Sequence, residues 1–205
     1  MQNLLLCCNI KNKPRKRNVP KRKMVMTIHA TLDLETLDYK PSSTVLTVGG
    51  VKFNPYSVDD PYDKFYYHIS IDDQDRFGRT VSDDTIEWWK GQNSDIMEEA
   101  FDQANAVSME EFLDVLNKWI VGVDVFWGQG YGFDYTILED MYRNLKRPIP
   151  WRFWEVRDSR TLFSLLREDP RKKMQKDLHN AYADAYYQSK AIQIAYSDLG
   201  ITGFK

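Results

Sequence analysis

The chain has 205 residues and a formal net charge of −2, and 42% of its residues are hydrophobic. This length and composition allow one domain with a sizeable core, which needs no disulfide or structural metal ion for its stability. Its only cysteines, Cys7 and Cys8, are adjacent near the N-terminus, a geometry that disfavours a disulfide between them. With three histidines and no cysteine in the body of the chain, the composition also argues against a structural zinc site.

The first 23 residues are strongly basic, with eight Lys and Arg and no acidic residue. The apolar run 4–8 is too short for a signal peptide, and its positive charges follow it instead of preceding it. We expect residues 1–23 to be a disordered leader, or to be translated from a start upstream of the true one at Met24 or Met26; contact with nucleic acid stays open. Residues 24–205 are expected to form the domain, and no stretch reaches the length of a membrane span.

Charge is uneven beyond the leader as well. There, 20 basic residues stand against 30 acidic ones, yet residues 143–176 carry eleven basic and four acidic side chains. An acidic domain with one basic stretch is what a metal site beside a phosphate-binding wall would produce. A solvated surface is the competing explanation for each individual charge.

The first half of the domain predicts strands followed by helices. Apolar and β-branched residues favour strands at 25–34, 44–54 and 64–70. The polar run 72–80 is expected to be a loop. Ser82 and the acids after it predict the start of a helix that carries Trp88 and Trp89, and Ser108 with Glu111 forms a capping box for a helix that ends at Trp119.

The second half alternates short strands with helices. The strands are expected at 123–127 and 153–156, and the helices at 133–145, 160–167 and 176–199. A glycine-rich turn, residues 128–132, separates the first of these strands from its helix. The order of elements predicts a single α/β domain with a mixed sheet and no internal repeat.

Two acidic residues lie at the end of the first predicted strand. Asp33 and Glu35 are two positions apart, so on an extended strand their side chains project from one face. Two such carboxylates repel each other unless a cation lies between them, and Mg²⁺ prefers oxygen ligands. A polar strand end is the plain alternative, because Asp-x-Glu alone is common by chance.

Two further motifs supply the remaining candidate residues of the site. Asp134 opens a helix directly after a strand and a glycine-rich turn, where the helix dipole alone could favour an acid. His179 and Asp184 are five residues apart, about 140° around a helix, so they do not share one helix face. We therefore expect His179 to approach from the start of the helix or the loop before it, although most lone histidines are merely solvated.

Together these motifs resemble the DEDD superfamily of 3′→5′ exonucleases, in its histidine-bearing (DEDDh, DnaQ-like) branch. The resemblance is carried by Asp33-Leu-Glu35-Thr36, Gly132-Phe-Asp134-Tyr-Thr-Ile-Leu138 and His179-Asn-Ala-Tyr-Ala-Asp184-Ala. The tyrosine-bearing branch would place its tyrosine at position 180, where this chain has Asn. Segments 85–90 and 153–161 are similar to a narrower group that contains bacteriophage exonuclease A and a mycobacterial exoribonuclease.

The resemblance implies a ribonuclease H-like fold, with a five-stranded mixed sheet, one antiparallel strand and helices on both faces. It implies that two Mg²⁺ or Mn²⁺ ions bind the four acids Asp33, Glu35, Asp134 and Asp184. Two metals about 4 Å apart can stabilise the attacking and leaving oxygens of an in-line displacement. His179 would take a proton from the attacking water, and nucleoside 5′-monophosphates would be released from the 3′ end.

Several side chains are candidates to hold a single-stranded 3′ end. Stacking on bases is expected from one of two adjacent tryptophans, since neighbours on a helix point about 100° apart. Terminal sugar and base contacts are expected from residues just past the first acidic motif and from the glycine-rich turn, and phosphate contacts from the basic stretch. The candidates are Trp88, Trp89, Thr36, Leu37, Tyr131, Phe133, Arg157, Arg160, Arg171, Lys172 and Lys173.

Two other functions compete with an exonuclease. An endonuclease or polynucleotidyl transferase could use the same fold, and a nucleic-acid-binding module could have kept the shape without the reaction. The choice between RNA and DNA is open, with a slight preference for RNA. The resemblance further suggests a bacterial cytoplasm, also one of a phage-infected cell, and a homodimer is an open possibility.

Overall fold

The structure is a computed structural model that describes residues 27–203 except 131 and 175–178. The predictions for the leader, residues 1–23, and for Tyr131 lie outside the described residues. The strands are β1 (His29–Thr36), β2 (Val45–Phe53), β3 (Tyr62–His68), β4 (Val125–Gly128) and β5 (Val156–Asp158). The helices are α1 (Ile71–Asp75), α2 (Asp83–Lys90), α3 (Ser94–Ala100), α4 (Met109–Trp119), α5 (Asp134–Asn144), α6 (Ser159–Phe163), η1 (Pro170–Lys173, a 3₁₀ helix) and α7 (Ala181–Asp198).

The strands form one mixed sheet in the order β3-β2-β1-β4-β5. Strand β2 runs antiparallel to β1 and β3, whereas β1, β4 and β5 pair in parallel. Thr31, in the middle of β1, lies opposite Val51 on one side and Trp127 on the other. The predicted five-stranded sheet with one antiparallel strand is confirmed.

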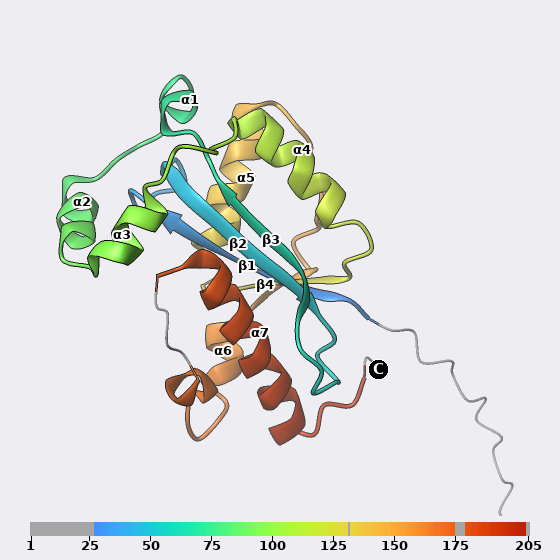
Figure 1. The fold of residues 1–205 in the computed structure, drawn as a ribbon. Coiled ribbons are helices and arrows are strands. Elements are labelled where there is room, and N and C mark those ends of the chain that lie inside the picture. Colours follow the sequence, from blue (N-terminus) through green and yellow to red (C-terminus); the bar gives the residue numbers. More distant parts are fainter. Residues whose placement is uncertain (1–26, 131, 175–178, 204–205) are drawn as a thin grey trace, which may run out of the picture.

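Helices cover both faces of this sheet (Figure 1). Ala30, Leu32 and Leu34 of β1 pack into one core with side chains of α4 and α5. On the opposite face, Val125 and Trp127 of β4 form a second core with α6 and α7. Because side chains alternate along a strand, residues 29, 31, 33 and 35 of β1 face α7. None of the helices in the described part of the chain combines the length and apolar character that crossing a bilayer requires.

Two predictions in the first half need correction. The expected loop at 72–80 begins with helix α1, because the Ser70 side chain caps it by accepting a hydrogen bond from the backbone of Asp73 at 3.2 Å. A separate helix, α3, follows α2 and was not predicted. Its cap is Asn93, whose side chain accepts from the Asp95 backbone at 2.8 Å. Both caps satisfy backbone N–H groups that a short helix would otherwise leave unpaired.

Three boundaries in the second half also differ from prediction. The expected strand 153–156 is mostly a turn, which Glu155 closes through its backbone and side-chain hydrogen bonds with Arg152, so β5 begins only at Val156. Helix α6 ends at Phe163, four residues before the predicted Arg167. Helix α7 begins at Ala181 instead of residue 176, because the side chain of Asn180 caps it.

Helix α7 lies unusually close to β2. A Cβ atom on Gly49 would stand 2.1 Å from the backbone carbonyl carbon of Ala181, so only glycine allows this approach. Thr31 of β1 adds a hydrogen bond of 2.8 Å from its hydroxyl to the carbonyl of Ala185. These two contacts fix the height of the first turns of α7 above the sheet.

We predict that Gly49→Ala destabilises the protein by about 1–3 kcal/mol, the usual penalty of overpacking, because the added methyl group meets backbone. Urea unfolding measures this change. Gly91→Ala is the matched control, since Gly91 has a φ of −84° and only an ordinary contact at 3.4 Å. Equal stability of the Gly49 variant and the control would contradict the close approach of α7.

His29 is fully buried beneath α7, among Phe53, Trp127 and Tyr196. Its Nδ1 accepts a hydrogen bond of 3.0 Å from the indole of Trp127. Burial, helped by the charge of Arg157, lowers the pKa of His29 to about 3. The folded protein therefore holds this histidine neutral.

Because the folded-state pKa of His29 lies below its unfolded value, protons bind the unfolded chain better, and stability falls as the pH drops below about 6.5. Between about pH 7 and about pH 5 this single group should cost about 2 kcal/mol of unfolding free energy. His29→Asn keeps an acceptor for Trp127 but cannot titrate. Denaturant unfolding of both proteins at the two pH values should show a smaller loss in the variant; identical losses would refute the assignment.

Candidate active site

Three distant segments bring five side chains to one cavity. Asp33 and Glu35 come from the end of β1, Asp134 from the first residue of α5, and Asp184 from the first turn of α7. His179 lies directly before the cap of α7, as the spacing predicted. All five line a cavity of about 700 Å³.

The tightest part of the cluster is formed by Glu35, His179 and Asp184. One potential ligand atom from each of these side chains lies within 4.8 Å of the others. The backbone N–H of His179 donates a hydrogen bond of 2.9 Å to Oδ2 of Asp184. His179 has a φ of +67°, a left-handed conformation that lets the chain turn back toward Asp184 before the helix begins.

The local sequence explains how Asp134 reaches the cluster. Strand β4 ends at Gly128, where a Cβ atom would lie 3.0 Å from Oδ2 of Asp134 and 3.0 Å from the ring of Tyr135. Glycine therefore leaves room for the carboxylate beside the strand. The ring of Tyr135 is buried against the sheet and anchors α5 by donating to the carbonyl of Trp127 at 3.3 Å.

The carboxylates disfavour one another's ionisation. Burial, together with the charges of Asp134 and Glu35, holds the pKa of Asp33 well above its usual range. Burial and the charge of Asp184, followed by that of Asp134, raise the pKa of Glu35 to about 8. Burial also raises the pKa of Asp134 to about 7, against backbone hydrogen bonds at Gln129 and Leu34 that favour the anion.

These residues fit a divalent cation site. Carboxylate oxygens are the ligands that Mg²⁺ prefers, and a cation between them would offset the repulsion that raises their pKa values. The imidazole of His179 stands at the open end of the set as a base or as a further ligand. A cluster of four buried or half-buried acids is otherwise costly to keep ionised.

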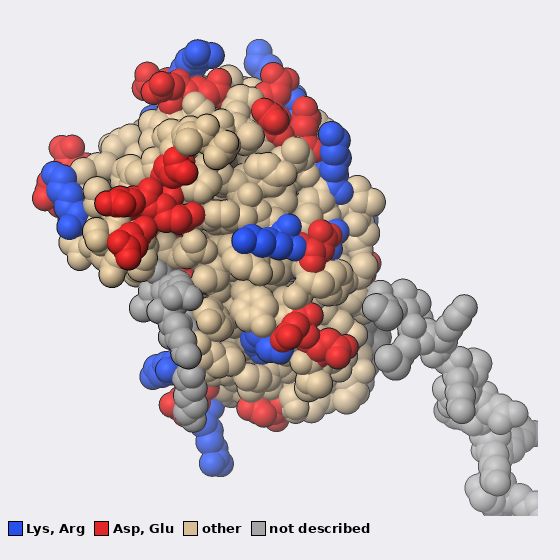
Figure 2. Space-filling view, in the orientation of Figure 1, with Lys and Arg blue, Asp and Glu red and all other residues tan. Residues whose placement is uncertain are grey.

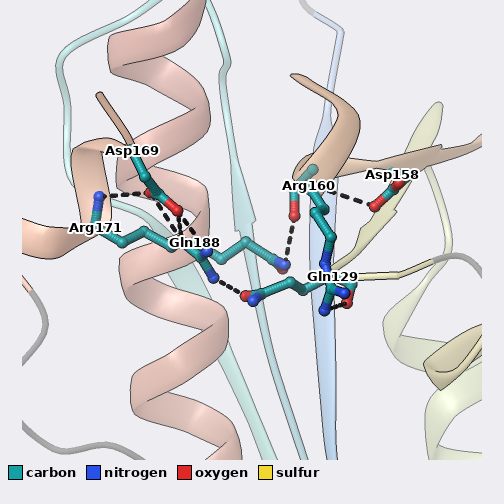
Figure 3. A network of polar contacts seen from close by, with 7 residues as sticks. Gln129, Asp158, Arg160, Asp169, Arg171 and Gln188 are labelled. Atoms are coloured by element: carbon teal, nitrogen blue, oxygen red, sulfur yellow. Dashed lines mark hydrogen bonds and ion pairs between the residues drawn. The ribbon is translucent and has the colours of Figure 1, made fainter. Parts of the chain in front are cut away.

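Part of the cavity lining, which we call the basic wall, is basic. Arg160, Arg171 and Lys172 line it, and Figure 3 shows how Gln129 lies between the two arginines. Arg160 donates to the carbonyl of Gln129 at 3.3 Å, and Arg171 donates to its side-chain oxygen. Asp169 accepts from Nε of Arg171 at 3.1 Å and from its Nη2 at 2.6 Å. The guanidinium of Arg171 is therefore held in place before any ligand binds.

The other predicted contacts are divided between cavity, core and surface. Phe133 lines the cavity. Trp88 is 43% exposed, and its ring meets that of His179 edge to face with centroids 4.8 Å apart. Trp89 is buried, and its indole donates to the carbonyl of Thr36 at 3.0 Å. One tryptophan thus faces the site and the other belongs to the core, as the helical geometry required.

Three substrate contacts expected from the sequence need correction. Leu37 is buried against Leu46 and Trp89, because the chain turns inward after β1. Thr36 is buried too, and its hydroxyl donates to the carbonyl of Asp38. Arg157 lies outside the cavity, where its guanidinium donates to the carbonyls of Trp154 and Val156. Tyr131 and the side chain of Lys173 lie outside the described residues.

Sequence reasoning missed two residues of the basic wall. Gln129 lies in a segment that offered only a flexible turn, and nothing in the sequence pointed to its contacts. Asp169 could have been found, because an acid before Pro170 predicts the cap of a short helix; its side chain accepts from the backbone of Arg171 at 3.0 Å.

Solved structures share this fold. Exonuclease I of E. coli, in its zinc-bound complex with single-stranded DNA, aligns with a TM-score of 0.63 and 13% identity, over 87% of this chain and 42% of that one. The nuclease domain of 3′hExo, a DEDDh family member bound to rAMP, aligns with a TM-score of 0.57 and 14% identity, over 87% and 96% of the two chains. The chain therefore spans about two fifths of Exonuclease I.

The chain therefore has the ribonuclease H-like fold of these exonucleases. An exodeoxyribonuclease of Enterobacteria phage T4 is 25% identical over 159 residues, 66% of this chain and 70% of that protein. The model of the Rv2179c-like 3′-5′ exoribonuclease domain matches residues 28–196, and the chain belongs to this family.

We predict that Asp33→Asn stabilises the protein by about 1 kcal/mol in a chelating buffer, because it removes one of the carboxylates that repel each other. Asp169→Asn is the matched control in the same cavity. Hydrogen bonds and the charge of Arg171 lower the pKa of Asp169, so its loss should destabilise. Denaturant unfolding near pH 8 compares the two; a shift of the same sign in both would contradict the electrostatic account.

Proposed function

We propose that the protein hydrolyses single-stranded nucleic acid from its 3′ end and releases nucleoside 5′-monophosphates. The observation that carries this proposal is the convergence of Asp33, Glu35, Asp134, Asp184 and His179 on one cavity that basic side chains also line. The four carboxylates would hold two Mg²⁺ ions, and Mn²⁺ should substitute. When bound, such a pair supplies charge stabilisation at the attacking and leaving oxygens of the phosphodiester.

His179 would act as the general base. The proximity of its imidazole to Glu35 and Asp184, with one potential ligand atom of each within 4.8 Å of the others, supports this role. A neutral imidazole nitrogen would accept a proton from the attacking water and later release it to solvent.

The charged side chains around the cavity would determine the path of the nucleic-acid strand. Arg160, Arg171 and Lys172 would bind the phosphates next to the scissile bond, because guanidinium groups match phosphate oxygens in charge and geometry. Figure 2 shows acidic side chains gathered over α3, the helix that carries Asp95 and Glu98. Repulsion from that surface would direct the strand along the basic wall, with Trp88 available to stack on a terminal base.

Both RNA and DNA are candidate substrates, and we favour RNA slightly. The family is described as an exoribonuclease domain, the phage relative is an exodeoxyribonuclease, and Exonuclease I has been solved with dT13. Hydrolysis rates on matched RNA and DNA strands test this choice. A DNA rate well above the RNA rate would reverse the preference.

We also propose where in the cell the protein acts and how it assembles. A bacterial or phage-infected cytoplasm provides both polynucleotide 3′ ends and Mg²⁺, and we propose that the protein acts there. A homodimer is proposed from the resemblance, and light scattering of the purified protein tests it directly.

We predict that Asp184→Asn lowers the hydrolysis rate by about 1000-fold or more while strand binding survives, because several kcal/mol of transition-state stabilisation depend on the metal ligands. The assay follows a 5′-labelled oligonucleotide with Mg²⁺ through single-nucleotide steps. Asp198→Asn, at the far end of the same helix, should leave the ladder unchanged.

The same gel distinguishes the competing functions of the wild-type protein. A ladder of stepwise products supports the exonuclease. A few internal fragments would indicate an endonuclease, and a mobility shift without shortening would indicate a binding module. Normal turnover by Asp184→Asn would overturn the metal-ligand assignment.

A further inference from the structure

A second polar cluster lies behind the active site, where β3, α3 and the start of α7 meet. We call it the Glu99 cluster; its members are Tyr66, His68, Glu99 and Asn180. Oε1 of Glu99 accepts from the hydroxyl of Tyr66 and lies 3.4 Å from Nε2 of His68. Oε2 accepts a hydrogen bond of 3.2 Å from the amide of Asn180. One carboxylate thus joins three segments of the chain.

Asn180 uses both ends of its amide. Its oxygen accepts from the backbone of Ala183 at 3.0 Å and so caps α7. Its nitrogen donates to Glu99 at 3.2 Å and lies 3.4 Å from the hydroxyl of Tyr66. Asp would cap the helix as well but has no donor to offer a carboxylate, whereas the amide of Asn caps through its oxygen and donates through its nitrogen. The helix cap alone therefore does not explain this side chain.

His179, the residue directly before Asn180, is held in an unfavourable backbone conformation. A non-glycine residue at a φ of +67° costs about 1–3 kcal/mol, and such a conformation persists only when its surroundings impose it. On one side, its N–H is bound by Asp184 at 2.9 Å and its ring rests against Trp88. On the other side, the next peptide is fixed by Asn180, whose amide is anchored on Glu99.

The choice of an acid at position 99 is itself informative. Glu99 adds one more carboxylate beside an already acidic site, where like charges repel, so electrostatics alone would favour a neutral residue. A carboxylate, however, offers two oxygens that accept only, which suits donors arriving from Tyr66, His68 and Asn180 together. Glutamine would offer a single oxygen to the same donors.

We propose that Glu99 is a positioning residue for the hydrolytic reaction. Through the amide of Asn180 it holds the backbone of His179 in the left-handed conformation, with the imidazole beside Glu35 and Asp184. Glu99 acts through Asn180 and contacts neither the substrate nor the reacting water. This inference rests on the proposed role of His179 as the general base.

An exchange of donor and acceptor tests the inference. Asn180→Asp keeps an oxygen to cap α7 but sets one carboxylate against another, so the link to Glu99 breaks. Adding Glu99→Gln to this variant restores the link with reversed polarity. The introduced amide can donate to the new carboxylate at position 180 while its oxygen accepts from Tyr66. Glu111→Gln, exposed on helix α4, removes the same charge and is the control.

The kcat and KM of both single variants and the double variant are measured on a 5′-labelled oligonucleotide with Mg²⁺, and the unfolding temperature is measured alongside. We expect Asn180→Asp to lower kcat by about 10–100-fold, the usual effect of losing an outer partner of a metal site, with KM within about twofold. The double variant should recover about tenfold in kcat over Asn180→Asp. Glu111→Gln should match the wild type, and all variants should unfold within a few degrees of it.

Three outcomes would overturn the inference. The first is wild-type kcat in Asn180→Asp. The second is a double variant whose kcat is no higher than the two single effects, multiplied together, predict. The third is a loss of kcat that merely tracks the unfolding temperature, since that indicates a structural role only. Failure of the proposed function looks different, because the wild-type protein itself would then produce no ladder.

Discussion

Mutual repulsion among four carboxylates is the constraint on which the rest of the structure depends. Asp33 and Glu35 extend from a strand in the middle of the sheet, and Asp134 and Asp184 are each held at the start of a helix. No local preference would bring these groups together; burial and the neighbouring carboxylates raise the pKa values of Asp33 and Glu35, and burial raises that of Asp134. Two well-packed cores supply the stability that offsets this cost.

The same constraint explains the close packing of α7. Asp184 reaches the other acids only because the helix approaches β2 at Gly49, where a side chain would collide with its backbone. The hydrogen bond between Thr31 and Ala185 holds the helix at that height. The basic wall lines the same cavity as these acids, with Arg171 oriented by Asp169 and Gln129. Acids and guanidinium groups around one cavity suit a phosphodiester whose charge is shared between metal ions and arginines.

The sequence predicted much of this architecture because the decisive patterns are local. The i, i+2 spacing of Asp33 and Glu35 fixes a shared strand face, and the five-residue spacing of His179 and Asp184 excludes a shared helix face. The capping box at Ser108 placed the start of α4 correctly, with the Ser108 side chain accepting from Glu111 at 3.1 Å. Together with the family resemblance, these spacings led us to propose the four acids and the histidine as a site, and the structure brings all five to one cavity.

The errors arose where tertiary contacts decide the outcome. Arg157 has the composition of a phosphate contact, yet it is bound to nearby carbonyls away from the cavity. Leu37 follows the first acidic motif directly, yet a turn carries it into the core. The contact between Glu99 and Asn180 joins residues 81 positions apart, and no periodic pattern in the sequence reports such a pair. Short helices such as α1 depend on single caps and are equally hard to predict.

The central claim is that these acids share divalent cations, and anomalous diffraction from crystals soaked in Mn²⁺ and a nucleoside 5′-monophosphate tests it most directly. The account predicts two anomalous peaks about 4 Å apart, bounded by Asp33, Glu35, Asp134 and Asp184, with the phosphate of the nucleotide on the side of Arg171. Peaks bound elsewhere, or a nucleotide seated with no manganese among the four carboxylates, would contradict it.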